Sequence, residues 1–158
     1  MKIMVTGHRP ERLNGKEKEV EAWLRDYLQN CSTKIECITG CAKGVDSIFA
    51  DVVMELNLPL ICAFPYKLDY NHNERVLSEP EQKMKDYAKE VHWQTGDWYK
   101  NCYLDRDKWM VDHSDVVLVV WDGIPKGGTY YTMEYAKKKN KLVLSFPWTS
   151  LEQIEKDL

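Results

Sequence analysis

The chain has 158 residues with 44% hydrophobic and 30% charged residues, which is typical of one soluble globular domain with a core of its own. Its net charge of -3 gives no sign of the basic stripe that nucleic-acid binding usually needs, so we do not expect nucleic acid as a partner. No apolar run approaches the ~20 residues of a membrane span and the start has no signal-peptide layout, so we expect a cytosolic protein without a membrane partner.

The apolar pattern of the first half predicts strands and helices in alternation. Residues 2–6 predict a strand, and apolar side chains at helical spacing predict an amphipathic helix over 15–29. Residues 35–39 predict a second strand, and a helix over 44–57 follows Gly40. The run 58–64 is continuously apolar, which is typical of a strand buried on both faces.

The second half continues the alternation after a polar and aromatic segment, 66–77, that we interpret as a loop. The predicted elements are a helix over 79–88, a strand from Lys89, a helix over 99–113, the strand in "SDVVLVVWDG", a helix over 128–139, and the strand in "KLVLSFP". A short helix is expected after Thr149.

This alternation predicts βαβ units, a parallel sheet and helices on both of its faces. We therefore expect a single doubly wound, mostly parallel-sheet Rossmann-like α/β domain over residues 1–158. Ligands of such sheets bind outside the carboxyl ends of the strands, near the point where the strand order reverses. The loops that directly follow the strands are the candidate site.

The first strand ends in Thr6-Gly7-His8-Arg9-Pro10. Gly7 allows backbone geometry that a side chain would block, and Arg9 carries a planar guanidinium suited to phosphate or carboxylate. The alternative is a polar turn in which Arg9 pairs with a nearby acid such as Glu11.

The second strand ends in "TGCAKGVDS", where Gly40 and Gly44 flank a tight loop that runs into a helix. Backbone N–H groups there can face an anion with the helix dipole behind them, although the spacing matches neither a Walker loop nor GxGxxG. Asp46, in the first helical turn, either caps that helix, which is the favoured interpretation, or accepts hydrogen bonds from a ribose hydroxyl.

The fifth strand ends in "WDGIPKGGTYYTMEYA". Asp122 and Gly123 turn the chain, and Gly127-Gly128-Thr129 forms a second candidate phosphate loop at a helix N-terminus. Upstream, Arg106 and Lys108 fall on the helix before this strand, and one of them can reach the same site. On that helix Trp109 and Met110 are expected in the core, and His113 at a cap or on the surface.

The cysteines are odd in number and show neither a CxxC pair nor zinc spacing, so we expect free thiols and no metal site. Most should be buried. Cys41 is the exception because it lies in the loop after the second strand, where partial exposure would make it reactive. The cysteines are Cys31, Cys37, Cys41, Cys62 and Cys102.

Taken together, these stretches resemble the SLOG superfamily, the Rossmann-like group that includes the DprA and LOG proteins, and specifically its YpsA-like branch. The matching stretches are "TGHRPERL", "TGCAKGVDSIFADV", "RDKWMVDHSDVVLVVWDG" and "KGGTYYTMEYA", in this order along the chain. The resemblance implies a nucleotide-type ligand at the carboxyl edge of the sheet. By motif, it implies these site residues: Gly7, His8, Arg9, Gly40, Ala42, Gly44, Asp46, Arg106, Gly123, Gly127, Gly128, Thr129 and Glu134.

In the LOG enzymes a related Gly-Gly-x-Gly-Thr-x-x-Glu loop supports cleavage of the N-glycosidic bond of a nucleoside monophosphate. This chain lacks the extra glycine and places Glu134 two positions farther from the threonine. Glu134 and Asp46 are nevertheless the candidate catalytic carboxylates if the protein is a nucleotide N-glycoside hydrolase or transferase.

Binding of a nucleotide or nucleotide-derived ligand, such as an ADP-ribose-type signal, for sensing or sequestration is the first functional hypothesis, and the enzyme is the second. No cofactor is expected. An aromatic side chain such as Tyr70, Trp98 or Tyr130 is expected to stack on the base. Related Rossmann-like domains often pair through helices beside the sheet, which favours a homo-oligomer.

Overall fold

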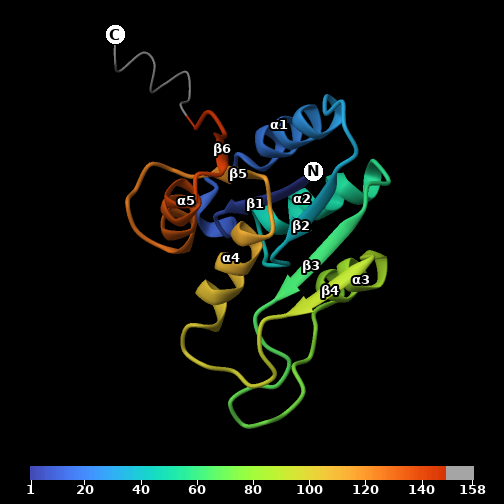
Figure 1. Ribbon diagram of the computed structural model, residues 1–158, viewed down its shortest axis with the longest axis vertical. Coiled ribbons are helices and arrows are strands. Elements are labelled where there is room, and N and C mark those ends of the chain that lie inside the picture. The colour runs from blue at the N-terminus through green and yellow to red at the C-terminus, as the bar shows by residue number, and fades with distance from the viewer. Residues whose placement is uncertain (149–158) are drawn as a thin grey trace.

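Within residues 1–148, the part of the chain that this computed structural model describes, six parallel strands form one sheet in the order β4-β3-β2-β1-β5-β6 (Figure 1). Their bounds are β1 Lys2–Gly7, β2 Glu36–Thr39, β3 Leu60–Phe64, β4 Glu90–Trp93, β5 Val116–Val120 and β6 Leu142–Ser145. Every neighbouring pair of strands is parallel. The helix expected after Thr149 lies outside the described residues.

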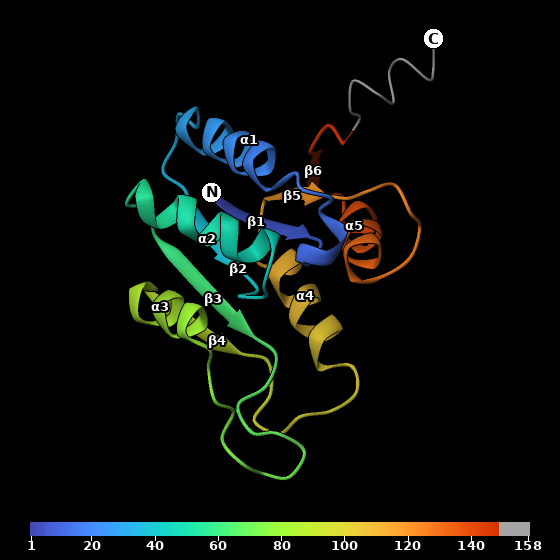
Figure 2. The same cartoon turned by 180° about the vertical axis from the view of Figure 1, so that it is seen from behind.

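Helices cover both faces of the sheet. They are α1 Glu17–Gln29, α2 Val45–Glu55, α3 Glu79–Tyr87, α4 Cys102–Asp112 and α5 Gly128–Lys138, with a short 3-10 turn, η1, at Pro10–Arg12. Helices α1, α2 and α3 pack on one face and α4 and α5 on the other, as the opposite views of Figures 1 and 2 show. The predicted doubly wound, Rossmann-like α/β fold is confirmed.

Strand side chains alternate between two apolar layers, and β1 shows why its sequence is continuously apolar. Ile3 and Val5 pack in the layer that contains Leu24 of α1, whereas Met4 packs in the layer that contains Met110 of α4. A central parallel strand is buried on both faces, so it needs apolar residues at consecutive positions.

The order of the strands reverses between β1 and β5. From β1 the chain adds β2, β3 and β4 on one side, and β5 and β6 then lie on the other side. The carboxyl ends of β1 and β5 are level, since Gly7 pairs with Val120. The turn after β1 and the turn after β5 therefore meet at the switch point, where ligands of such sheets bind.

Element identities follow the apolar pattern, whereas several boundaries differ by up to three residues. The third strand begins at Leu60 rather than residue 58, and α4 begins at Cys102 rather than residue 99. The loop predicted over 66–77 is confirmed, with only isolated bridges at Leu68. The sequence did not predict η1. None of the described helices is long and apolar enough to cross a membrane.

We expect Leu118→Ala to lower the free energy of unfolding by about 2–5 kcal/mol, because it leaves a cavity in the apolar layer between the sheet and the helices α1 and α2. Leu118 is fully buried on β5. The matched control is Leu142→Ala on the edge strand β6, where the side chain is 56% exposed. Urea denaturation measures both changes, and similar losses for the two variants would contradict this account of the core.

Candidate functional site

The turn after β1 and the loop after β2 are packed so closely that two positions require glycine. A Cβ on Gly7 would lie 2.6 Å from the side chain of Val45. Gly44 has φ +94°, and a Cβ there would lie 2.4 Å from the carbonyl oxygen of His8. The backbone N–H of Val45 donates to that same oxygen at 3.2 Å. These contacts bring the start of α2 to the end of β1.

His8 links the two turns at the switch point. Its side chain is buried, and its Nε2 accepts a hydrogen bond from the backbone N–H of Asp122 at 3.0 Å. Trp148 packs edge-on against its ring at a centroid distance of 6.0 Å. Burial lowers the pKa of His8, although Asp122 partly opposes this effect. His8 is therefore neutral near pH 7, with its proton on Nδ1.

Arg12, from η1, holds the turn after β5 through a forked ion pair. Its Nε donates to Oδ2 of Asp122 at 3.1 Å, and its Nη2 donates to Oδ1 at 2.9 Å. Burial raises the pKa of Asp122, but hydrogen bonds from the Ile124 N–H and from Arg12 outweigh it and leave the pKa lowered. The bidentate geometry fixes the orientation of both side chains.

Arg106 projects from α4 to the ends of β2 and β3. Its Nη1 donates to the carbonyl oxygens of Gly40 at 2.7 Å and Ala63 at 3.1 Å. Its Nε donates to Asp107 at 2.8 Å. Its Nη2 makes no hydrogen bond within residues 1–148. The buried guanidinium is therefore held in one orientation, and the N–H groups of its Nη2 can still donate to a ligand.

Asp46, in the first turn of α2, lies beside this arginine. Its Oδ2 accepts the N–H of Ala42 at 3.2 Å, and a Cβ on Gly40 would lie 2.8 Å from the same oxygen. The carboxylate closes the loop before α2 and does not bond the helix's own N–H groups, so the capping interpretation is wrong. Burial raises the pKa of Asp46 to about 6, although Arg106 opposes this shift.

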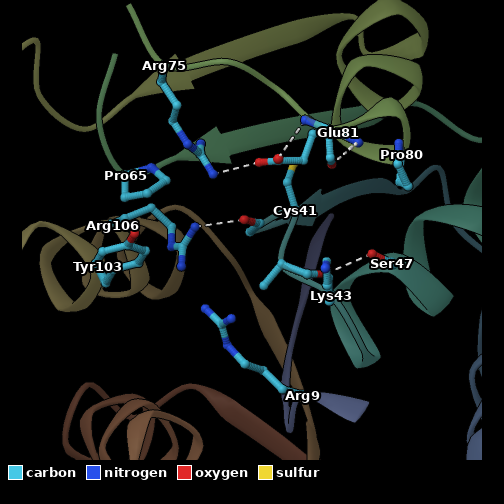
Figure 3. A pocket seen from close by; sticks show the side chains of 13 residues that line it. Arg9, Cys41, Lys43, Ser47, Pro65, Arg75, Pro80, Glu81, Tyr103 and Arg106 are labelled. Carbon is cyan, nitrogen blue, oxygen red and sulfur yellow. Dashed lines mark hydrogen bonds and ion pairs between the residues drawn. The ribbon is translucent and has the colours of Figure 1, made fainter. Parts of the chain in front are cut away.

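These loops surround a cleft with two adjoining compartments. The switch compartment, of about 450 Å³, lies at the switch point between the β1 turn, α4 and the start of α5. The outer compartment, of about 270 Å³, lies beside the β2–α2 loop and the start of α3 (Figure 3). Both are lined by Arg9, Ala42, Tyr103 and Arg106.

Arg9 and Arg106 approach the cleft from opposite sides. Figure 3 shows their guanidinium groups pointing toward one another. Arg9 is exposed and forms no ion pair within the described part of the chain, so the alternative that it pairs with Glu11 is wrong. Two guanidinium groups that face one space favour an anion between them.

A family model described as the YspA SLOG family matches residues 3–151. The chain belongs to the SLOG family. No curated protein matches the sequence significantly.

Solved structures show the same fold at low identity. DNA processing protein A (DprA) from Streptococcus pneumoniae aligns with 98% of this chain at a TM-score of 0.72 and 19% identity. This chain spans only 53% of that DprA chain. DprA from Helicobacter pylori, solved to describe its single-stranded DNA binding mode, has a TM-score of 0.70 and 19% identity over 99% of this chain and 73% of its own. The structural-genomics target TM1055 has a TM-score of 0.62 and 16% identity, over 90% and 71%.

This SLOG fold brings most of the predicted site residues to the cleft. Those that line it are Gly7, His8, Arg9, Gly40, Ala42, Asp46, Arg106, Gly128 and Thr129. Gly44 shapes the loop behind it. Gly127 lies against Arg12, where an added Cβ would be 3.1 Å from Nη1, and Gly123 faces open space.

Glu134 does not reach either compartment. Its side chain is about half exposed, and its carboxylate lies 3.7 Å from Nζ of Lys137. Thr129 lines the switch compartment, and five residues of helix rotate Glu134 about 140° away from it. Thr129 and Glu134 therefore lie on different faces of α5, which explains why the carboxylate points away from the compartment.

The aromatic residue at the cleft is Tyr103, which sequence reasoning missed. Tyr70 and Trp98 contact one another on the loops beyond β3 and β4, and Tyr130 packs against Trp121. None of these three lines the two compartments. Tyr103 precedes Arg106 by three residues, so helical spacing could have placed it beside that arginine.

The sequence did not predict several further cleft residues. Arg12 and Asp107 line the switch compartment, and Arg75 lines the outer one. Lys108 does not line the cleft and lies over the ring of Tyr135, 5.6 Å from its centroid.

Cys41 is buried, so the partial exposure expected for it is wrong. The neighbouring Cys62 and burial together raise the pKa of the Cys41 thiol.

Asp46 predicts a specific pH dependence of stability. Its pKa is raised to about 6 from 3.8, so between those values the folded state holds a proton that the unfolded state releases. The contribution of Asp46 to the free energy of unfolding is thus largest below pH 4. It falls by at most about 3 kcal/mol as the pH rises to 6, and it does not change further above pH 6.

The measurement is urea denaturation of the wild type and of Asp46→Asn from pH 4 to 7.5. The difference in unfolding free energy, wild type minus variant, should fall up to about pH 6 and then level off. Subtracting the variant removes the titration of other carboxyl groups. A difference that rises with pH would contradict the raised pKa of the Asp46 carboxyl group.

Proposed function

We propose that this protein binds a nucleotide or nucleotide-derived ligand at the carboxyl edge of its sheet, for sensing or sequestration. The observation that carries this proposal is the convergence of Arg9, from the turn after β1, and Arg106, from α4, on one cleft (Figure 3). A guanidinium held in place by other groups is pre-organised for a phosphate, since less freedom is lost on binding.

Polar groups around these arginines suit the remainder of a nucleotide. Gly128 and Thr129 line the switch compartment at the start of α5, where the first backbone N–H groups of the helix can donate to the nucleoside. Asp46 offers a carboxylate oxygen to a ribose hydroxyl, and Tyr103 offers a ring face to a base. Membership of the SLOG family and the likeness to DNA processing proteins support a nucleotide-related role.

Arg9→Ala should weaken nucleotide binding by about tenfold or more, because one charge-assisted hydrogen bond contributes about 1.5–3 kcal/mol. The measurement is calorimetry with a panel of AMP, ADP and ADP-ribose. Arg25→Ala is the matched control, since Arg25 lies on α1 and pairs with Glu21 and Glu55. No heat with any nucleotide from folded wild-type protein would overturn the proposal.

An N-glycoside hydrolase is the second candidate, and the raised pKa of Asp46 favours it. A carboxyl group that titrates near pH 6 inside a cleft can act as a general acid or base. We expect any release of free base from nucleoside monophosphates to fall at least 100-fold in Asp46→Asn. Glu134→Gln should leave it unchanged, because that side chain lies outside the cleft. The opposite ranking of the two variants would assign the chemistry to Glu134.

Single-stranded DNA is a third candidate ligand, although the net charge led us to expect no nucleic-acid partner. The net charge is -3, yet the outer compartment is lined by Arg9, Lys43, Arg75 and Arg106. An overall acidic balance therefore does not prevent a local cationic surface. A salt-dependent mobility shift with single-stranded DNA is the expected signature, and its absence at low salt would remove this candidate.

The cytosolic location and the homo-oligomer stay predictions, and light scattering tests the second. The single domain over 1–158 also stays a prediction, because residues 149–158 lie outside the described part of the chain.

A further inference from the structure

We propose that the ligand of this cleft is a nucleoside carrying a diphosphate, with its second phosphate in the outer compartment. The nucleoside occupies the switch compartment, and the first phosphate lies between Arg9 and Arg106. The second phosphate lies near Lys43 and Arg75. This inference rests on the proposed function and specifies its ligand.

The two compartments differ in charge in a way that a single phosphate does not explain. The switch compartment is lined by three basic side chains and three acidic ones, Arg9, Arg12, Arg106, Glu11, Asp46 and Asp107. The outer compartment is lined by Arg9, Lys43, Arg75 and Arg106 and by one acid, Glu81. The mixed compartment suits a ribose, whereas the cationic one suits an anion.

The side chains shared by the two compartments mark the path between them. Arg9 and Arg106 line both, so a phosphate between them has space on either side. A nucleoside monophosphate placed there fills the switch compartment and leaves the more cationic space empty. A second phosphate extends directly into that space.

Arg75 supplies a donor that has no acceptor within the described residues. Its Nη2 donates to Glu81 at 2.6 Å, while its buried Nη1 has no hydrogen-bond partner. Its guanidinium lies over the rings of Phe64 and Tyr66, at 5.7 and 5.0 Å from their centroids. A buried N–H without a partner costs about 1–3 kcal/mol, and a phosphate oxygen offers it an acceptor.

Lys43 and Ser47 complete the outer compartment from the β2–α2 side. Lys43 is exposed and forms no ion pair within residues 1–148. The Ser47 hydroxyl donates to the carbonyl oxygen of Ala42 at 2.8 Å, so Lys43 is the side chain that offers donors to a phosphate from this side. The volume of about 270 Å³ is below the ~300 Å³ of the smallest usual ligand pockets, which suits an extension of the neighbouring site.

The test is calorimetry with AMP, ADP and ADP-ribose, without added divalent cations. We expect ADP to bind at least tenfold more tightly than AMP. Lys43→Ala and Arg75→Gln should each reduce this ratio to about threefold or less. Lys18→Ala, an exposed position on α1, is the matched control and should leave the ratio unchanged. Arg75 also forms an ion pair with Glu81, so Arg75→Gln can fail to fold. In that case Lys43→Ala alone decides the test.

The outcomes separate the inference from the function on which it rests. If no nucleotide binds, the proposed function fails. If AMP and ADP bind equally, or if Lys43→Ala weakens both to the same extent, the diphosphate inference fails and nucleotide binding stands. ADP-ribose binding at least as tightly as ADP supports a bridging diphosphate, whereas tighter binding of ADP supports a terminal one. Tight binding of single-stranded DNA with no response to ADP overturns the inference.

Discussion

The site depends on one buried guanidinium. Arg106 donates to the carbonyl oxygens of Gly40 and Ala63 and to the carboxylate of Asp107, and thereby joins α4 to the ends of β2 and β3. Gly40 lies just past the end of β2, and Ala63 lies one position past the Thr39–Cys62 pair that ends the ladder between β2 and β3. Because a buried charge is stable only when it is paired and hydrogen-bonded, these contacts determine where α4 lies relative to the sheet.

Glycine makes the surrounding loops fit this arrangement. A side chain at Gly40 would meet Asp46 and Arg106, and one at Gly44 would meet the backbone of His8. The loop after β2 can therefore lie against both the arginine and the β1 turn. On the other side, Arg12 and His8 hold Asp122 in place. The cleft is thus bounded by fixed polar contacts, while Arg9 is exposed at its mouth.

Local charge and total charge lead to different expectations for this protein. Acidic side chains on the outer surfaces, such as Glu21 and Glu55, make the sum negative without affecting the cleft. Arg9, Arg75 and Arg106 come from separate parts of the chain, and the parallel sheet brings their segments together at its carboxyl edge. At cellular salt the Debye length is about 8 Å, so a bound anion responds mainly to these nearby groups.

The sequence by itself determined the order and type of the elements, because a buried parallel strand needs an apolar run and a helix needs apolar residues at 3.6-residue spacing. It also identified Arg9, Gly40, Asp46 and Arg106 as residues of one edge. Only the tertiary structure decided which side chains share the cleft. Arg75 joins it through contacts between segments that are distant in the sequence, which no local pattern shows. Tyr103 and Glu134 follow from helical spacing only once the structure has placed Arg106 and Thr129 at the cleft.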